Sequence, residues 1–306
     1  MSGRIEVRRM SETGSPINDS FQPLNNAPQW FLDNIRIPGK SILTQVAGRS
    51  VHMLAWNWDN TELPTLMLVH GFGAHSHWWS FLAPFFRDRY RIVALDLPGM
   101  GDSEPPAVYE DNCFARAIVG CIEQHQLQPV CIIGHSFGGA QSLRATVMSP
   151  HLFSHGIVVD TNVRLPPEPL IRKLQPKGSH KPSPTRAECM TRFRLVPPQP
   201  NHIDALVHYI AFHSCAGEQQ NWHWKSDPNC LNVGEIEDPD LLRAVSIQID
   251  MIYGEKSFLN IENKPERVLA HFSRAGKLLT IPEAGHHIMV DHPLDLVAAI
   301  KALLIN

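Results

Sequence analysis

A serine flanked by glycines provides the clearest nucleophile in the sequence. Residues 130–140 read VCIIGHSFGGA, an apolar β-branched run that breaks at Ser136 and continues as a helix pattern over 140–148. A serine at such a sharp strand-to-helix turn has a strained backbone, so the residues two before and two after it must lack bulk, as Gly134 and Gly138 do. We therefore predict that Ser136 is a catalytic nucleophile.

Two loops are expected to bind the negative charge that develops on a substrate oxygen. Because backbone N–H groups at the start of a helix have no intrahelical partner, the N–H of Phe137 is the first candidate donor. The second is the N–H of Phe72, in the loop His70-Gly71-Phe72-Gly73 that follows an apolar run over 65–69. His70 is interpreted as a hydrogen-bonded brace of this loop and not as a base.

A serine hydroxyl needs a base to act near neutral pH, and the base needs a third group that fixes its tautomer. His286 follows an expected strand over 278–281 and should lie at the same end of the sheet as Ser136. We predict that His286 is the base in preference to His287, because His286 directly follows the turn at Gly285.

The third group is predicted to be Asp160, which ends an expected strand over 156–160 on the neighbouring side of the same crevice. Glu255, in the loop after a strand that ends near Tyr253, is the alternative acid. A turn or helix-capping role is the structural alternative for Asp160, since aspartates at strand ends often have that role.

Apolar runs and helical patterns alternate along the chain, which predicts an α/β fold with a mostly parallel sheet and helices on both of its faces. Two strands joined by a turn at Gly48 predict an antiparallel hairpin at one sheet edge. Asp96 and Asp102 lie in a turn rich in Gly and Pro and are interpreted as turn formers. Besides the run before Ser136, strands are expected over 41–46, 50–58, 65–69, 91–95, 156–160, 246–253 and 277–281, and helices over 78–87, 112–126, 140–148, 265–272 and 294–304.

The alternation fails between residues 161 and 244, a stretch rich in proline and then in aromatic residues and histidine. This stretch is too long for a loop without structure of its own, so we predict a mainly helical cap subdomain inserted over the carboxyl ends of the strands. Residues 29–160 and 245–306 are expected to form the two parts of the core. The polar residues 1–28 predict a flexible or draped N-terminal arm.

The composition argues against several classes of partner. The 27 basic and 30 acidic residues give a net charge of −3 without a basic stripe, so binding to nucleic acid or to an anionic membrane is not expected. A small, largely uncharged substrate fits this balance better. The histidines lack matching cysteine or carboxylate spacing, so no metal is expected, and no cofactor is predicted.

The six cysteines show no paired spacing and are expected to be free thiols. No apolar segment has the length of a signal peptide core or of a membrane span, which favours a soluble, cytoplasmic protein. The sequence does not indicate an oligomeric state.

In this order, four motifs resemble the α/β-hydrolase superfamily in its cap-bearing branch: residues 70–73, 96–103, 134–139 and 285–287. The resemblance spans about residues 40–304. It implies an eight-stranded sheet, a Ser–His–acid triad, and an oxyanion hole formed by Phe72 and Phe137.

The resemblance also marks two points of difference within that branch. Haloalkane dehalogenases and epoxide hydrolases are similar in layout but use an aspartate nucleophile, where this chain has Ser136. The usual acid of the family is replaced by Ser257, whereas some dehalogenases carry their acid at the strand end that matches Asp160.

These features predict a hydrolase of carboxylic esters that forms an acyl-enzyme: Ser136 attacks, His286 transfers the proton and Asp160 orients His286. A second hypothesis is hydrolysis of a carbon–carbon bond or a lactone by the same triad, with residues such as Arg192, Arg194 or Trp222 binding a polar substrate. A third is a non-catalytic binding protein on the same scaffold.

Overall fold

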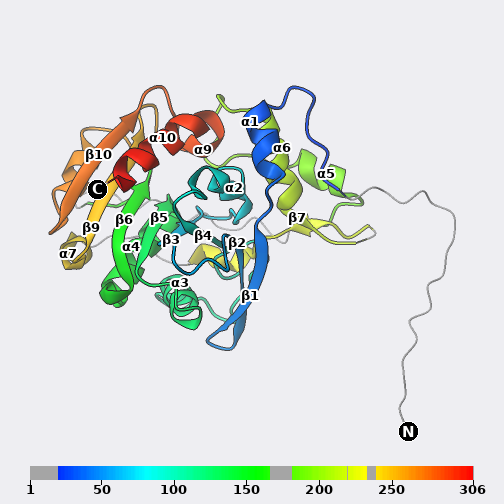
Figure 1. Ribbon diagram of the computed structural model, residues 1–306. Coiled ribbons are helices and arrows are strands. Elements are labelled where there is room, and N and C mark those ends of the chain that lie inside the picture. Colours follow the sequence, from blue (N-terminus) through cyan, green and yellow to red (C-terminus); the bar gives the residue numbers. More distant parts are fainter. Residues whose placement is uncertain (1–19, 166–180, 219, 233–238, 306) are drawn as a thin grey trace, which may run out of the picture.

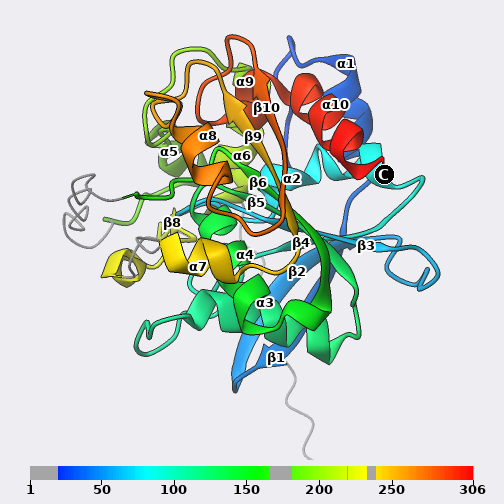
Figure 2. The same cartoon turned by 90° about the vertical axis from the view of Figure 1, so that its left-hand side faces the viewer.

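The computed structural model of the protein describes residues 20–165, 181–218, 220–232 and 239–305. Its centre is an eight-stranded sheet with helices against both faces (Figure 1, Figure 2). From β4 to β10 the neighbouring strands are parallel, and β2 is antiparallel to both of its neighbours. The predicted α/β fold with a mostly parallel sheet is confirmed. The strand order is β1 (Lys40–Val46), β2 (Arg49–Trp56), β4 (Arg91–Leu95), β3 (Thr65–Val69), β5 (Val130–His135), β6 (Phe153–Val159), β9 (Gln248–Gly254) and β10 (Ala275–Ile281).

Local sequence explains the strands closely. β1 and β2 form the predicted edge hairpin, and their turn at Ala47 and Gly48 has positive φ angles of 50° and 76°, as the tight turns of hairpins require. Strands β3 and β4 coincide with the predicted apolar runs. All residues of these two strands are buried, because parallel strands in the middle of such a sheet are covered on both faces.

Two apolar cores lie on the two faces of the sheet. Side chains of β3 alternate between them, with Met67 and Val69 in one core and Leu66 and Leu68 in the other. The first core is covered by α3 (Cys113–Gln124), α4 (Phe137–Met148), α7 (Pro239–Ala244) and α8 (Lys264–Leu269), and the second by α1 (Gln29–Ile35), α2 (His77–Ser80), α9 (Ile288–Asp291) and α10 (Pro293–Leu304). A 3₁₀ helix, η2 (Pro150–Leu152), precedes β6.

The helices differ from the prediction in several places, among them α8, which ends at Leu269, and α9, which was not predicted. The helix expected over 78–87 is the short α2 followed by a 3₁₀ helix, η1 (Ala83–Phe86), because Pro84 has no N–H with which to continue an α-helix. Helix α4 begins at Phe137 instead of residue 140. The sequence pattern did not predict α1, a helix of 7 residues in which only Phe31 is buried.

Residues 161–244, which lie between β6 and β9 and are here called the insertion, contact segments that follow the carboxyl ends of the strands. Gly101 N, after β4, donates to Lys225 O at 2.8 Å, and Ile203 N donates to Val290 O, after β10, at 2.7 Å. Residues 166–180, 219 and 233–238 lie outside the described residues, and the domain boundaries stay a prediction. The described elements of the insertion are α5 (Arg186–Thr191), α6 (Asp204–His213), a two-stranded sheet of β7 (Cys215–Ala216) and β8 (His223–Trp224), the 3₁₀ helix η3 (Pro228–Asn232) and α7.

The described end of the N-terminal arm lies against α6. The ring centroid of Phe21 is 5.0 Å from that of Tyr209 and 5.4 Å from that of Phe212. Residues 1–19 of the predicted arm lie outside the described residues.

All six cysteines are free thiols, which confirms that prediction. In the described part of the chain, no helix combines the length and the apolar character that crossing a membrane requires.

Candidate active site

Ser136 lies at the turn between β5 and α4 in a strained conformation. Its φ is 52° and its ψ is −120°, an unusual combination for a residue with a side chain, and its N–H donates to Val159 O at 2.9 Å. A Cβ on Gly134 would lie 2.5 Å from the Cα of Gly139, and a Cβ on Gly138 would overlap the carbonyl oxygen of His70. The glycines are therefore required by the close packing of this turn.

His286 is hydrogen-bonded to a buried carboxylate at the end of the neighbouring strand β6. His286 Nδ1 donates to Asp160 Oδ2 at 2.6 Å, and Asp160 is fully buried. The same Oδ2 accepts from Ser257 Oγ at 2.5 Å, and Oδ1 accepts from Gly254 N at 3.0 Å. With its proton held on Nδ1, His286 keeps a lone pair on Nε2, as a general base requires.

The loops that carry Ser136 and His286 meet at the carboxyl end of the sheet. His135, which immediately precedes Ser136, donates from Nε2 to His286 O at 3.0 Å, and the two imidazole centroids are 4.9 Å apart. Burial, with the neighbouring His286, lowers the pKa of His135 well below its usual value. His135 is therefore a neutral contact between the two loops. Its place next to Ser136 was the only sequence signal for this role.

The alternative base and acid lie in other surroundings. His287 Nε2 donates to Pro197 O at 3.2 Å, and burial lowers the pKa of His287 to about 3. Glu255 is exposed, and its Oε2 accepts from Glu283 N at 2.9 Å. His286 Nδ1 therefore has Asp160 as its carboxylate partner, and neither His287 nor Glu255 takes part in that hydrogen bond.

The two predicted oxyanion donors belong to adjacent loops. The ring centroids of Phe72 and Phe137 are 5.5 Å apart, and a Cβ on Gly71 would lie 3.5 Å from Ser136 Cβ. Among the described residues, the N–H groups of Phe72 and Phe137 have no hydrogen-bond partner. His70 Nδ1 donates to Gly71 O at 2.7 Å and its Nε2 accepts from Leu97 N at 3.0 Å, as expected of a loop brace.

Ser257 is the residue whose part in this site sequence reasoning missed. The sequence indicates only that an acid is absent at this position, whereas the structure shows a buried hydroxyl bonded to Asp160. Leu259 N donates to Ser257 Oγ at 3.1 Å, so the hydroxyl proton is free to point at the carboxylate. A fully buried carboxylate needs several donors, and a small hydroxyl residue nearby was the available signal.

One ring nitrogen each of His135, His286 and His287 lies within 4.8 Å of the others, a spacing that could hold a metal ion. Each ring already bonds an oxygen through one nitrogen: His286 O, Asp160 Oδ2 and Pro197 O respectively. These hydrogen bonds account for the cluster as part of the site, and the absence of a metal stays a prediction.

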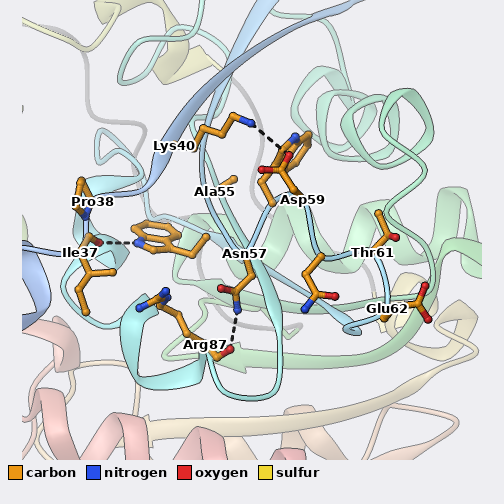
Figure 3. Close-up of a pocket in the computed structure, with 12 residues that line it drawn as sticks. Ile37, Pro38, Lys40, Ala55, Asn57, Asp59, Thr61, Glu62 and Arg87 are labelled. Atoms are coloured by element: carbon orange, nitrogen blue, oxygen red, sulfur yellow. Dashed lines mark hydrogen bonds and ion pairs between the residues drawn. The ribbon is translucent and has the colours of Figure 1, made fainter.

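A separate groove of about 650 Å³ lies at the amino end of β3, away from these residues (Figure 3). Its polar groups bond one another: Trp56 Nε1 donates to Ile37 O at 2.8 Å, and Lys40 Nζ lies 3.4 Å from Asp59 Oδ1. None of the predicted site residues lines this groove.

Comparison with known proteins agrees with this architecture. A family model described as "Alpha/beta hydrolase family" matches residues 66–300. A putative esterase/lipase of Haemophilus influenzae is 24% identical over 241 residues, which cover 79% of this chain and 83% of the relative. The hydrolase YugF of Bacillus subtilis is 35% identical over 105 residues, which cover 34% of this chain but only 38% of the relative.

Solved structures share the fold at low sequence identity. The thioesterase domain of a curacin biosynthetic pathway has a TM-score of 0.72 at 20% identity and covers 86% of this chain and 99% of its own. An esterase of Mycobacterium tuberculosis has a TM-score of 0.70 at 17% identity and covers 92% of this chain and 100% of its own.

Proposed function

The chain belongs to the alpha/beta hydrolase family, and on this premise we propose that it is a serine hydrolase that cleaves carboxylic esters of small, largely uncharged substrates. The observation that carries the proposal is the 2.6 Å hydrogen bond from His286 Nδ1 to the buried Asp160, on a loop that contacts the Ser136 turn. The reaction proceeds through an acyl-enzyme on Ser136.

The first half of the reaction forms the acyl-enzyme. Ser136 Oγ attacks the acyl carbon and gives its proton to His286 Nε2, while Asp160 stabilises the imidazolium and holds its orientation. The oxygen that becomes negative accepts hydrogen bonds from the N–H groups of Phe72 and Phe137. His286 then gives the proton to the leaving alkoxide, which departs as the alcohol.

In the second half of the reaction, water takes the place of Ser136 as the nucleophile and Ser136 becomes the leaving group. His286 removes a proton from water, the hydroxide attacks the acyl carbon, and Ser136 leaves with the returned proton. The free N–H groups of the two loops support oxyanion binding, because preorganised donors need no rearrangement when the charge develops.

The two other hypotheses have less support. Arg192 donates to Lys181 O at 3.0 Å, and Arg194 donates to Thr191 O at 2.8 Å, so both guanidinium groups bond the backbone of their own segment. This disfavours their use in a polar substrate pocket for carbon–carbon or lactone cleavage. A binding protein would have no need of a strained serine turn that contacts the loop of a carboxylate-bonded histidine.

Labelling and mutation test the proposal directly. A fluorophosphonate probe should label the wild-type protein, and the protein should hydrolyse p-nitrophenyl butanoate. Ser136→Ala should lose both properties while keeping the melting temperature within a few degrees. Ser149→Ala, at the other end of the same helix, is the matched control and should keep both. Turnover that survives Ser136→Ala would refute the assignment.

A further inference from the structure

Phe72 and Phe258 are the only exposed side chains among the described phenylalanine, tyrosine and tryptophan residues. Phe72 is 40% exposed and Phe258 is 50% exposed, whereas every other described phenylalanine, tyrosine and tryptophan is buried or half-buried. Single exposed apolar residues are common on proteins, so exposure alone indicates nothing. Both of these residues, however, border the proposed catalytic groups, and they do so on different sides.

Phe258 lies against the proposed base. Its ring centroid is 5.1 Å from that of His286, and the residue follows directly on Ser257, which bonds Asp160. In acyl transfer the base must return its proton to the leaving oxygen, which requires that oxygen within hydrogen-bond reach of the imidazole. A ring that packs on this imidazole and is half open to solvent is therefore beside the alcohol part of the substrate.

Phe72 lies on the other loop of the site. Its N–H is a proposed oxyanion donor, and its ring packs edge-on against Phe137 with the centroids 5.5 Å apart. The oxyanion is the former carbonyl oxygen of the acyl group. That oxygen is bonded to a carbon that carries both the acyl chain and the leaving oxygen, and the leaving oxygen faces His286, against which Phe258 packs. Phe72 packs on Phe137 instead, so we assign its ring to the other substituent of the carbonyl carbon, the acyl chain.

The charged residues next to Phe258 do not compete for this role. Lys256 Nζ lies 3.7 Å from Glu255 Oε2 and 3.4 Å from Glu283 Oε1, so these exposed charges pair with one another. The loop thus offers the substrate an aromatic ring, which favours an apolar group.

We propose that Phe258 contacts the leaving alcohol and Phe72 the acyl chain, so that the preferred substrate is an ester that is apolar on both sides of its carbonyl group. This inference rests on the proposed function. It assigns a separate specificity to each residue, and the two specificities can be measured independently.

The test uses the full chain and four esters: methyl and benzyl esters of acetic and hexanoic acid, with released acid followed by titration. For each variant, the benzyl-to-methyl ratio of kcat/KM reports the alcohol side, and the hexanoate-to-acetate ratio reports the acyl side. A uniform loss of rate cancels in both ratios. Leu43→Ala removes a residue that is 64% exposed on the edge strand β1 and serves as the matched control.

Phe258→Ala should lower the alcohol ratio about tenfold and leave the acyl ratio within about twofold, and Phe72→Ala should do the reverse. Leu43→Ala should change neither. Phe258→Leu and Phe72→Leu, which keep an apolar side chain, should fall between wild type and alanine. Unchanged ratios, or ratios that move together in both variants, would overturn the inference while fluorophosphonate labelling of Ser136 leaves the proposed function standing. Absence of labelling and of all turnover in the wild type would refute both.

Discussion

Replacing Asp160 with asparagine should abolish most of the activity, because it moves the imidazole proton of His286 to the other ring nitrogen. The shape of the site stays the same. The carboxylate accepts from His286, Ser257 and Gly254 at 2.6, 2.5 and 3.0 Å. An asparagine amide that presents its NH₂ to His286 needs an acceptor there, so the imidazole proton moves to Nε2. The lone pair of His286 then lies on Nδ1, toward residue 160, and is not available to accept the proton of the proposed nucleophile Ser136.

The expected loss in kcat is about 10⁴-fold, the size of the effect when a triad carboxylate is replaced by its amide. This corresponds to about 5.5 kcal/mol of transition-state stabilisation. The fold should also lose about 2 kcal/mol, since hydrogen bonds to a buried charge are stronger than neutral ones. Glu255→Gln is the control, because that carboxylate is exposed, bonds Glu283 N and lies near Lys256, but has no contact with His286. It should change kcat by less than about twofold.

The assay is hydrolysis of p-nitrophenyl butanoate under saturating substrate, with fluorophosphonate labelling to count intact sites. A second variant, Asp160→Asn with Ser257→Asp, sharpens the result. Ser257 Oγ lies 2.5 Å from Asp160 Oδ2, the oxygen that His286 bonds, and an aspartate is one bond longer than a serine, so we expect a carboxylate at position 257 to reach His286. The double variant should have a kcat at least about tenfold above that of Asp160→Asn alone. A fall of less than tenfold for Asp160→Asn, or a larger fall for Glu255→Gln, would refute the assignment of the acid.

Three further predictions concern stability. Gly138→Ala should lower the free energy of unfolding, measured in urea, by about 3 kcal/mol, because its Cβ would overlap His70 O. Gly48→Ala, in open space at φ 76°, is the control and should lower it by about 1 kcal/mol. Equal losses in the two variants would contradict the packing argument. Burial lowers the pKa of His77 to about 4 from 6.5, so below pH 6.5 the unfolded chain binds more protons than the folded chain. The contribution of His77 to the free energy of unfolding should therefore fall by about 2 kcal/mol between pH 8 and pH 5. His77→Gln should flatten that part of the pH dependence, and an unchanged slope would show that other groups cause it. Phe21→Ala should cost about 2 kcal/mol and speed hydrogen exchange in α6 first, as seen by exchange mass spectrometry; uniform acceleration over the chain would argue against a local contact.

The parts of the fold that sequence predicted well are those with a purely local cause. Strands β3 and β4 are bounded as predicted because a strand buried on both faces must be apolar at every position. The edge hairpin follows from the turn at Gly48. The glycines around Ser136 also have a local cause, since any side chain at Gly134 or Gly138 meets backbone atoms.

The parts that sequence did not predict depend on contacts between distant segments. Helix α1 has a weak local pattern and is stabilised where Phe31 packs edge-on against Phe81 and Tyr209. In the insertion, composition indicated aromatic residues and histidines but not their partners. The structure stacks His77 on His213 at 3.6 Å, and no periodicity within either segment predicts that contact.

The proposed acid, Asp160, illustrates how a site can depart from a family pattern and stay consistent in its chemistry. His286 bonds Asp160, which follows β6, and the same carboxylate oxygen accepts from Ser257 in the loop after β9. Because Asp160 provides the charge from β6, the position after β9 has only to supply a hydrogen-bond donor, which Ser257 does. A second carboxylate at Ser257 would place two like charges within bonding distance in a buried site, and one of them would have to take up a proton. A carboxylate at position 160 therefore favours a neutral hydrogen-bond donor, such as serine, at position 257.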